Sequence, residues 1–192
     1  MQLSKLEAAR RQLETAIKLY FGYGDEVSIH TLAAAAYSLI RDINGHRGGE
    51  PMLKDLHLFL SDELAREFRK YINRPENFLK HADKDVDGVG ELEPRWTEAL
   101  LWEASRKYCE MTGEQNKLML TFVFWFVERQ PELREQFEKD CASQGLTNQL
   151  KSLPHLPLND RKRFFELLNL QMLKTRLPEL PLCWKPQQQL LG

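Results

Sequence analysis

Apolar residues recur at three- and four-residue spacing along almost the whole chain, and this periodicity restricts the fold more than any other feature. The N-terminal segment shows it most clearly, with charged residues between the apolar positions Leu6, Ala9, Leu13, Ala16, Ile17 and Tyr20. Such spacing places the apolar side chains on one face of a helix. A chain built from segments of this kind is predicted to be all-α.

Glycine, proline and capping residues divide this pattern into separate helices. Gly22 ends the first helix, and Ser28 is predicted to cap a second one that stops near Asn44. A third helical region has a break at Ser61, and Pro75 opens a short helix because proline suits a first helical position. Further helices are predicted over residues 95–111, 118–128, 132–143 and 160–176, the last of them capped by Asn159.

Residues 118–127 are almost entirely apolar and include Phe122, Phe124, Trp125 and Phe126. Their composition also suits a strand, and periodicity does not separate a buried strand from a buried helix. Because the chain offers no partner strand, the segment is predicted to form the central buried helix or one half of a dimer seam. Most of its aromatic side chains are expected to pack in the core of the chain. Those that the core does not cover would lie in a dimer interface.

The fold class that follows is all-α, a bundle of six to eight helices with a proline-rich C-terminal tail. Residues 1–150 are assigned to the bundle, and residues 151–192 to a linker, the final helix and the tail. The tail from Leu177 contains three prolines and is typical of an extended segment. It is a candidate for docking into a groove of a protein partner or of the chain itself.

The composition is that of a soluble globular protein, and it argues against a membrane-spanning protein and against one that binds nucleic acid through its overall charge. Its 42% apolar content can fill a core, and its 27 basic and 28 acidic side chains leave a net charge of −1. Such a chain has no overall attraction to nucleic acid or to an anionic membrane, so any RNA contact needs a local patch. The longest apolar run is about half the length that crosses a bilayer, and the N-terminus lacks the features of a signal peptide.

Three widely spaced cysteines, Cys109, Cys141 and Cys183, form no C-x-x-C pair. Neither a zinc site nor a disulfide framework is predicted, and a reduced cytoplasmic compartment fits best. No cofactor is predicted.

One segment, from Arg74 to Gly88, concentrates groups that bind phosphate, move a proton or hold a cation. Within it, Asn77 follows Arg74 by three residues and His81 follows Asn77 by four. This spacing places all three on one helical face. Histidine suits a base near neutral pH, and a guanidinium stabilises charge developing on a phosphate. These three are therefore candidate catalytic residues of an RNase. Asn77 would position the phosphate, and Lys80 would add charge from the flank.

A structural interpretation of the same segment needs no function. Arg74 would then pair with Glu76 or with an aspartate of the following loop, and His81 would close the helix C-terminus, where the helix dipole favours it. His30, in the first turn of the second helix, is by default a buried or capping histidine. It becomes a candidate ligand-binding residue if it lies near His81.

The loop after this helix begins like a calcium-binding loop, with Asp83, Asp85 and Asp87 at its first, third and fifth positions and Gly88 at its sixth. Pro94 occupies the twelfth position, where a bidentate glutamate is needed. Asp-Gly turns are also common in exposed loops. The three aspartates are therefore weak candidates, and no metal is predicted.

Two stretches of the first half of the chain carry a resemblance to a known family. The first joins Lys5-Leu-Glu-Ala-Ala-Arg-Arg-Gln-Leu-Glu-Thr-Ala-Ile17 to Val27-Ser-Ile-His-Thr-Leu-Ala-Ala-Ala-Ala-Tyr37, and the second is Asn77-Phe-Leu-Lys-His-Ala-Asp83. They resemble a group of uncharacterised bacterial proteins that is similar to the HEPN superfamily of small helical domains.

The resemblance implies a helical bundle, commonly dimeric, acting in RNA or nucleotide transactions of bacterial stress or defence. Many HEPN domains are metal-independent RNases with an arginine and a histidine four to six residues apart, and six residues separate Arg74 from His81. A polar residue often follows that arginine, whereas Pro75 stands here. Other relatives are non-catalytic. We therefore expect a homodimeric interaction module or nucleotide- or RNA-binding module, with the RNase as the alternative.

Overall fold

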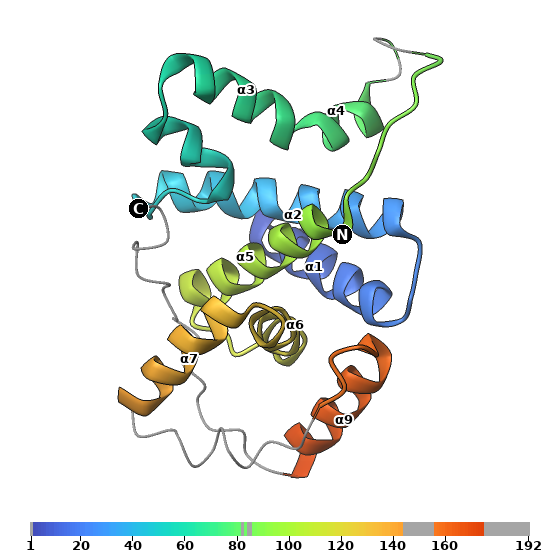
Figure 1. Ribbon diagram of the computed structural model, residues 1–192, viewed down its shortest axis with the longest axis vertical. Coiled ribbons are helices and arrows are strands. Elements are labelled where there is room, and N and C mark those ends of the chain that lie inside the picture. Colours follow the sequence, from blue (N-terminus) through green and yellow to red (C-terminus); the bar gives the residue numbers. More distant parts are fainter. Residues whose placement is uncertain (1, 82, 84–85, 144–155, 175–192) are drawn as a thin grey trace.

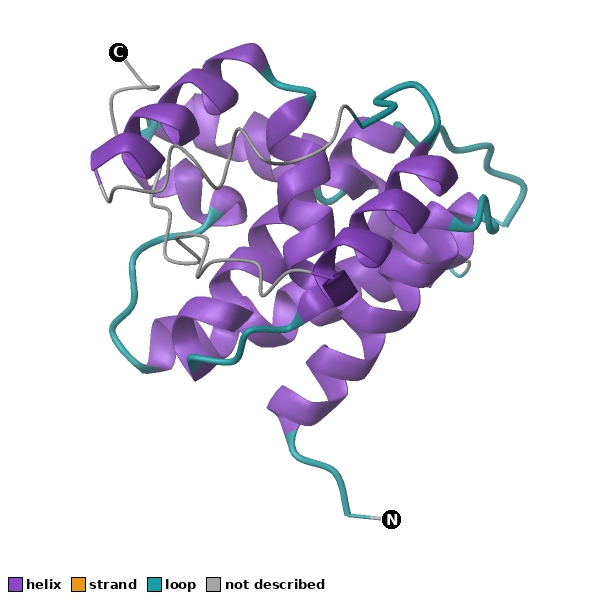
Figure 2. Ribbon diagram, turned by 90° about the horizontal axis from the view of Figure 1, so that it is seen from below, coloured by secondary structure: helices purple, strands orange, loops and turns teal. Residues whose placement is uncertain are grey.

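The computed structural model describes residues 2–81, 83, 86–143 and 156–174. These ranges contain eight α-helices, one 3-10 helix and no strand, so the all-α class is confirmed for them. Figure 2 shows the helices joined by loops. With the 3-10 helix included, the count is one higher than the six to eight expected. The predicted linker and proline-rich tail lie largely outside the described residues.

Four helices build the core: α1 (Lys5–Phe21), α2 (Glu26–His46), α5 (Pro94–Thr112) and α6 (Lys117–Glu128). The buried residues of α1 are those that its periodicity predicts, among them Leu13 and Ile17. Ala33 and Ala36 of α2 are fully buried, and their small side chains allow the neighbouring helices to approach closely.

The apolar segment 118–127 forms a helix, α6, that is buried within the single chain. Phe122 is fully buried and meets the ring of Tyr20 edge to face at 5.1 Å. On the outer side of α6, Phe126 stacks on Trp102 at 5.0 Å. The aromatic side chains of α6 are thus packed by other parts of the same chain. None of the helices in the described ranges combines the length and apolar character needed to span a bilayer.

Two further helices cover the lower side of this core in Figure 1, namely α7 (Pro131–Ser143) and α9 (Arg161–Lys174). Phe164 of α9 packs against Trp125 of α6, with ring centroids 4.8 Å apart. Phe137 of α7 lies against Phe124 on the same side of α6. The C-terminal helix therefore belongs to the same core as the N-terminal bundle.

An outer layer lies above α2 in Figure 1 and consists of η1 (Leu53–Phe59), α3 (Asp62–Ile72) and α4 (Arg74–Lys80). The predicted break at Ser61 is confirmed, since Ser61 is the N-cap of α3. The predicted helix start at Pro75 is confirmed too. α3 packs chiefly against η1 and α4, and α4 lies against α2. Hydrogen bonds from the backbone of Leu53 and Lys54 attach η1 to α5 and α2.

Two predicted caps are wrong by a few residues. Asp25 caps α2 in place of Ser28, because the Asp25 carboxylate accepts the backbone N–H of Ser28 at 2.8 Å. At α9, Asp160 rather than Asn159 accepts the N–H three residues later, from Arg163 at 2.9 Å. In both places two capping side chains lie close together in sequence, and the one that reaches the N3 amide caps the helix.

The position of the core predicts that two Leu→Ala substitutions differ in their effect on the free energy of unfolding. Leu101 is fully buried, whereas Leu170 on α9 is 51% exposed. Leu101→Ala should lower the free energy of unfolding by about 2–5 kcal/mol, because it leaves a cavity. Leu170→Ala should change it by less than about 0.5 kcal/mol. Urea unfolding followed by circular dichroism measures both, and equal effects would contradict the placement of the core.

Candidate functional site

Three of the predicted site residues, Arg74, Asn77 and His81, line one pocket. Its volume is about 310 Å³, and it is bounded by α4, the end of α3 and the segment 89–91. The helical spacing anticipated this shared face. The remaining lining residues are Lys70, Pro75, Phe78, Val89, Gly90 and Glu91.

The Arg74 guanidinium is available to a ligand. Arg74 is exposed, and within the described part of the chain it makes no hydrogen bond or ion pair. Of the partners that the structural interpretation named, Glu76, Asp83 and Asp87 form no ion pair with Arg74, and Asp85 lies outside the described residues. Glu76 is instead engaged by Lys54 and by Lys80, whose Nζ lies 3.4 Å from its Oε2.

His81 has a structural position and also lines the pocket. It is the C-cap of α4, and its backbone N–H donates to the carbonyl of Asn77 at 3.1 Å. Its Nδ1 lies 3.9 Å from the Asp83 carboxylate, and its side chain is 43% exposed. The ring is therefore accessible to solvent and to a ligand.

One wall of the pocket depends on a close approach between Phe78 and Gly90. A Cβ at Gly90 would lie 2.7 Å from the Phe78 ring, so a side chain at this position would force the two apart. Phe78 is 43% exposed and presents an apolar ring beside the polar groups of the pocket.

Among the described lining residues of the pocket, cationic side chains outnumber acidic ones. Lys70 and Arg74 contribute two cations and Glu91 one carboxylate, and Asp83 lies beside His81 at the edge of the pocket. Asn77 supplies an amide that can donate and accept hydrogen bonds. This set of groups suits an anion with several oxygens, such as a phosphate.

The two predicted flanking residues lie elsewhere. Lys80 pairs with Glu76 and does not line the pocket. His30 is buried, and its Nδ1 lies 2.9 Å from Thr97 Oγ1. Burial lowers the pKa of His30 to about 4, and the positive charges of Lys54 and Lys80 act in the same direction. His30 is therefore neutral at physiological pH and closed off from the pocket.

A buried polar network connects the core to the outer layer. The Tyr37 hydroxyl donates to Glu103 at 2.9 Å and accepts the backbone N–H of Lys54 at 3.0 Å. The same carboxylate of Glu103 accepts the N–H of Leu53 at 2.9 Å. The Lys54 ammonium then pairs with Glu76 of α4, and both of these side chains are buried. This network attaches η1 and α4, and with α4 the pocket, to the core.

The sequence analysis missed this network, although one signal was present. Glu103 follows Leu100 by three residues and precedes Ala104, so it lies on the buried face of α5. A carboxyl group on such a face needs partners. Burial raises the pKa of Glu103, and the hydrogen bonds from Leu53 and Tyr37 act against that rise.

The weak metal candidates remain untested as a group. Asp83 and Asp87 are described, but Asp85 lies outside the described residues. Among the residues that the structure describes, no three His, Cys, Asp or Glu side chains gather closely enough to hold a metal ion. Cys109 and Cys141 are both buried, and Cys183 lies outside the described ranges.

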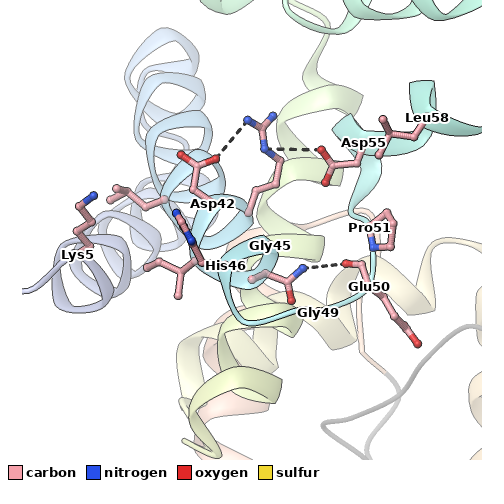
Figure 3. Close-up of a pocket in the computed structure, with 13 residues that line it drawn as sticks. Lys5, Asp42, Gly45, His46, Gly49, Glu50, Pro51, Asp55 and Leu58 are labelled. Carbon is pink, nitrogen blue, oxygen red and sulfur yellow. Dashed lines mark hydrogen bonds and ion pairs between the residues drawn. The ribbon is translucent and has the colours of Figure 1, made fainter.

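A second pocket of about 700 Å³ lies where the end of α2 meets η1 (Figure 3). Arg41 lies between two carboxylates, 3.3 Å from Asp42 and 3.8 Å from Asp55. The Asn44 amide donates to the carbonyl of Glu50 at 2.8 Å and so fixes the loop between them. The described lining of this pocket carries more carboxylates, Asp42, Glu50 and Asp55, than cations, Lys5 and Arg41, so it lacks the positive excess found at α4.

Comparison with protein-family models, with curated proteins and with solved structures finds no match for this chain.

The buried imidazole of His30 predicts a dependence of stability on pH. Its pKa is lowered from 6.5 to about 4 in the folded state, so the unfolded chain binds the proton more tightly. The free energy of unfolding should therefore fall by at most about 3 kcal/mol as the pH drops from 6.5 toward 4. Urea unfolding of wild type and His30→Gln over this range measures the contribution. His46→Gln, at an exposed histidine, is the matched control, and a pH profile unchanged by His30→Gln would refute this role.

The buried Lys54–Glu76 ion pair predicts that substitution of Glu76 lowers the free energy of unfolding strongly. Glu76→Gln leaves the buried Lys54 ammonium without a counter-charge and should lower the free energy of unfolding by about 3 kcal/mol or more. Adding Lys54→Met should recover most of that loss. Glu135→Gln breaks the exposed pair with Lys139 and should cost less than about 1 kcal/mol. Chemical denaturation compares the three variants, and equal effects at Glu76 and Glu135 would argue against the pair.

Proposed function

We propose that this chain is a binding module that takes single-stranded RNA, with a phosphate and its neighbouring base held in the pocket at α4. The observation that carries the proposal is the convergence of Lys70, Arg74 and His81 around one cavity, whose described lining residues include one carboxylate, Glu91. A local excess of positive charge is what a chain of net charge −1 needs in order to bind a polyanion.

The side chains support a specific mode of binding. The forked guanidinium of Arg74 can donate two hydrogen bonds to one phosphate, and Lys70 can neutralise the same group from α3. Asn77, one turn along α4, can hydrogen bond to the sugar or to a base edge. Phe78 offers a ring on which a base can stack, as single-stranded nucleic acid commonly does on aromatic side chains.

The size of the pocket fits this proposal. A volume of about 310 Å³ lies at the lower end of the range for small-ligand sites and accommodates roughly one nucleotide. With few phosphate contacts, binding should be modest and sensitive to salt. The resemblance to HEPN domains points to RNA or nucleotide chemistry through the same residues, which adds to the argument from charge.

A second function, metal-independent RNA cleavage, is favoured by the presence of Arg74 and His81 in the same pocket. His81 would take the proton of the ribose 2′-hydroxyl as that oxygen attacks the phosphorus, and Arg74 would stabilise the developing charge. The P–O5′ bond then breaks to leave a 2′,3′-cyclic phosphate, and the leaving 5′-oxygen takes a proton from water. Asn77 would orient the phosphate. Pro75, which follows Arg74 where RNase relatives often have a polar residue, weighs against this activity and leaves the binding module as the leading proposal.

Binding is tested by fluorescence anisotropy with a short labelled single-stranded RNA of mixed sequence at low ionic strength. Arg74→Ala should weaken binding about tenfold or more, since it removes a charged hydrogen bond to phosphate. Arg66→Ala removes an equal charge from an exposed position of α3 outside the pocket and should have little effect. Equal losses in both variants, or no binding by wild type, would overturn the proposed site.

The stacking role is tested with a matched pair of phenylalanines. Phe78→Ala should weaken RNA binding by about 1–3 kcal/mol. Phe59→Ala, at a position that is 69% exposed and outside the pocket, should not. Incubation of RNA with the protein and EDTA then separates the two functions. Cleavage that persists in EDTA and is lost in both Arg74→Ala and His81→Ala would establish the RNase.

A further inference from the structure

Helix α3 presents an apolar face to solvent. Leu64 and Tyr71 are 55% and 46% exposed, and the half-buried Phe68 lies between them at helical spacing. Ala65 and Ile72, around the helix, are the residues that α3 buries. We call Leu64, Phe68 and Tyr71 the α3 apolar face. Three more exposed apolar residues come directly before the helix, namely Leu58, Phe59 and Leu60.

Such a concentration of exposed apolar side chains calls for a partner. Leu64, Phe68 and Tyr71 share one helical face, and large apolar faces left exposed on proteins are mostly used for binding. The remaining contacts of α3 do not cover this face, because the helix packs chiefly against η1 and α4. The Tyr71 ring meets Trp96 edge to face at 5.6 Å and remains nearly half exposed.

The charges along α3 are arranged so that a second α3 running antiparallel to it would place opposite charges side by side. Its first turn is acidic, with Asp62 and Glu63, and its last turn is basic, with Arg69 and Lys70. Glu63 and Lys70 are seven residues apart, so they lie on the same flank of the apolar face. A helix with this pattern matches a second, antiparallel copy of itself.

We infer that a second copy of this chain covers the α3 apolar face, with the two α3 helices antiparallel about a two-fold axis. Leu64 then packs on the partner's Tyr71, and the two Phe68 side chains meet close to the axis. Glu63 pairs with the partner's Lys70, so the dimer and an RNA phosphate would compete for that ammonium. Every contact is made twice, as a two-fold interface requires, and each acidic first turn lies beside a basic last turn.

Other occupants fit the same surface less well. Glu63 and Glu67 flank the apolar face, whereas a helix that lies on an anionic membrane carries mainly Lys and Arg there. The interface is small, since α3 has 11 residues and is about 16 Å long. The dimer should therefore be weak and dependent on concentration. The inference does not rest on RNA binding, and its test contains no RNA.

Sedimentation velocity of the full chain over a wide range of concentrations tests the surface. Wild type should shift from monomer to dimer as its concentration rises. Leu64→Glu should weaken the dimer at least about tenfold, because each interface would bury two new charges. Leu170→Glu makes the same substitution at a leucine of similar exposure, 51%, on α9 and should leave the dimer intact. A wild type that stays monomeric, or equal effects of the two variants, would overturn the inference.

Charge reversal tests the antiparallel arrangement. Glu63→Lys and Lys70→Glu should each weaken the dimer about fivefold, since each replaces two attractive pairs by two repulsive ones. Combining the two substitutions should restore it, because the pairs re-form with opposite signs. Failure of the double variant to recover, with circular dichroism showing a folded chain, would rule out the antiparallel pairing.

Discussion

The buried carboxylate of Glu103 is the group on which the arrangement of the outer layer depends. It accepts hydrogen bonds from the Tyr37 hydroxyl and from the backbone N–H of Leu53, and the Tyr37 hydroxyl in turn accepts the N–H of Lys54. The first turn of η1 is thereby held between α2 and α5. Lys54 then extends from this anchored turn to Glu76, so the position of α4 follows from a carboxyl group in the core.

The residues that stabilise the fold and the candidate binding residues therefore lie mostly in different layers. The core of α1, α2, α5 and α6 is closed mainly by aromatic and aliphatic packing among these helices, α7 and α9, to which the start of η1 adds Met52 and Leu53. The groups suited to binding lie on α3, α4 and the following loop, where Arg74 and Phe78 are exposed. Binding residues mounted on a peripheral layer can change without disturbing the core, whereas Glu76 must stay because it balances a buried ammonium.

The sequence predicts the helices well because each one carries an apolar face that repeats in the α-helical period. It also predicts that Arg74, Asn77 and His81 share a face, since that relation depends only on spacing along α4. It does not predict Lys70 and Glu91 as their neighbours, because these come from α3 and from a loop brought close by the approach of Gly90 to Phe78. The Lys54–Glu76 pair escapes prediction for a similar reason. A charged residue is expected at the surface until the partner that allows its burial is known.

The way in which α3 is mounted has a consequence for how the native state fluctuates. α3 packs chiefly on η1 and α4. These attach to the core through the buried polar network and the packing of Met52 and Leu53, so the outer layer can open while most of the core remains folded. In amide hydrogen exchange, the backbone of η1, α3 and α4 should behave as one cooperative unit with a lower free energy of opening than α1 or α6. Anything that occupies Arg74 or covers Leu64 would slow exchange across the whole unit.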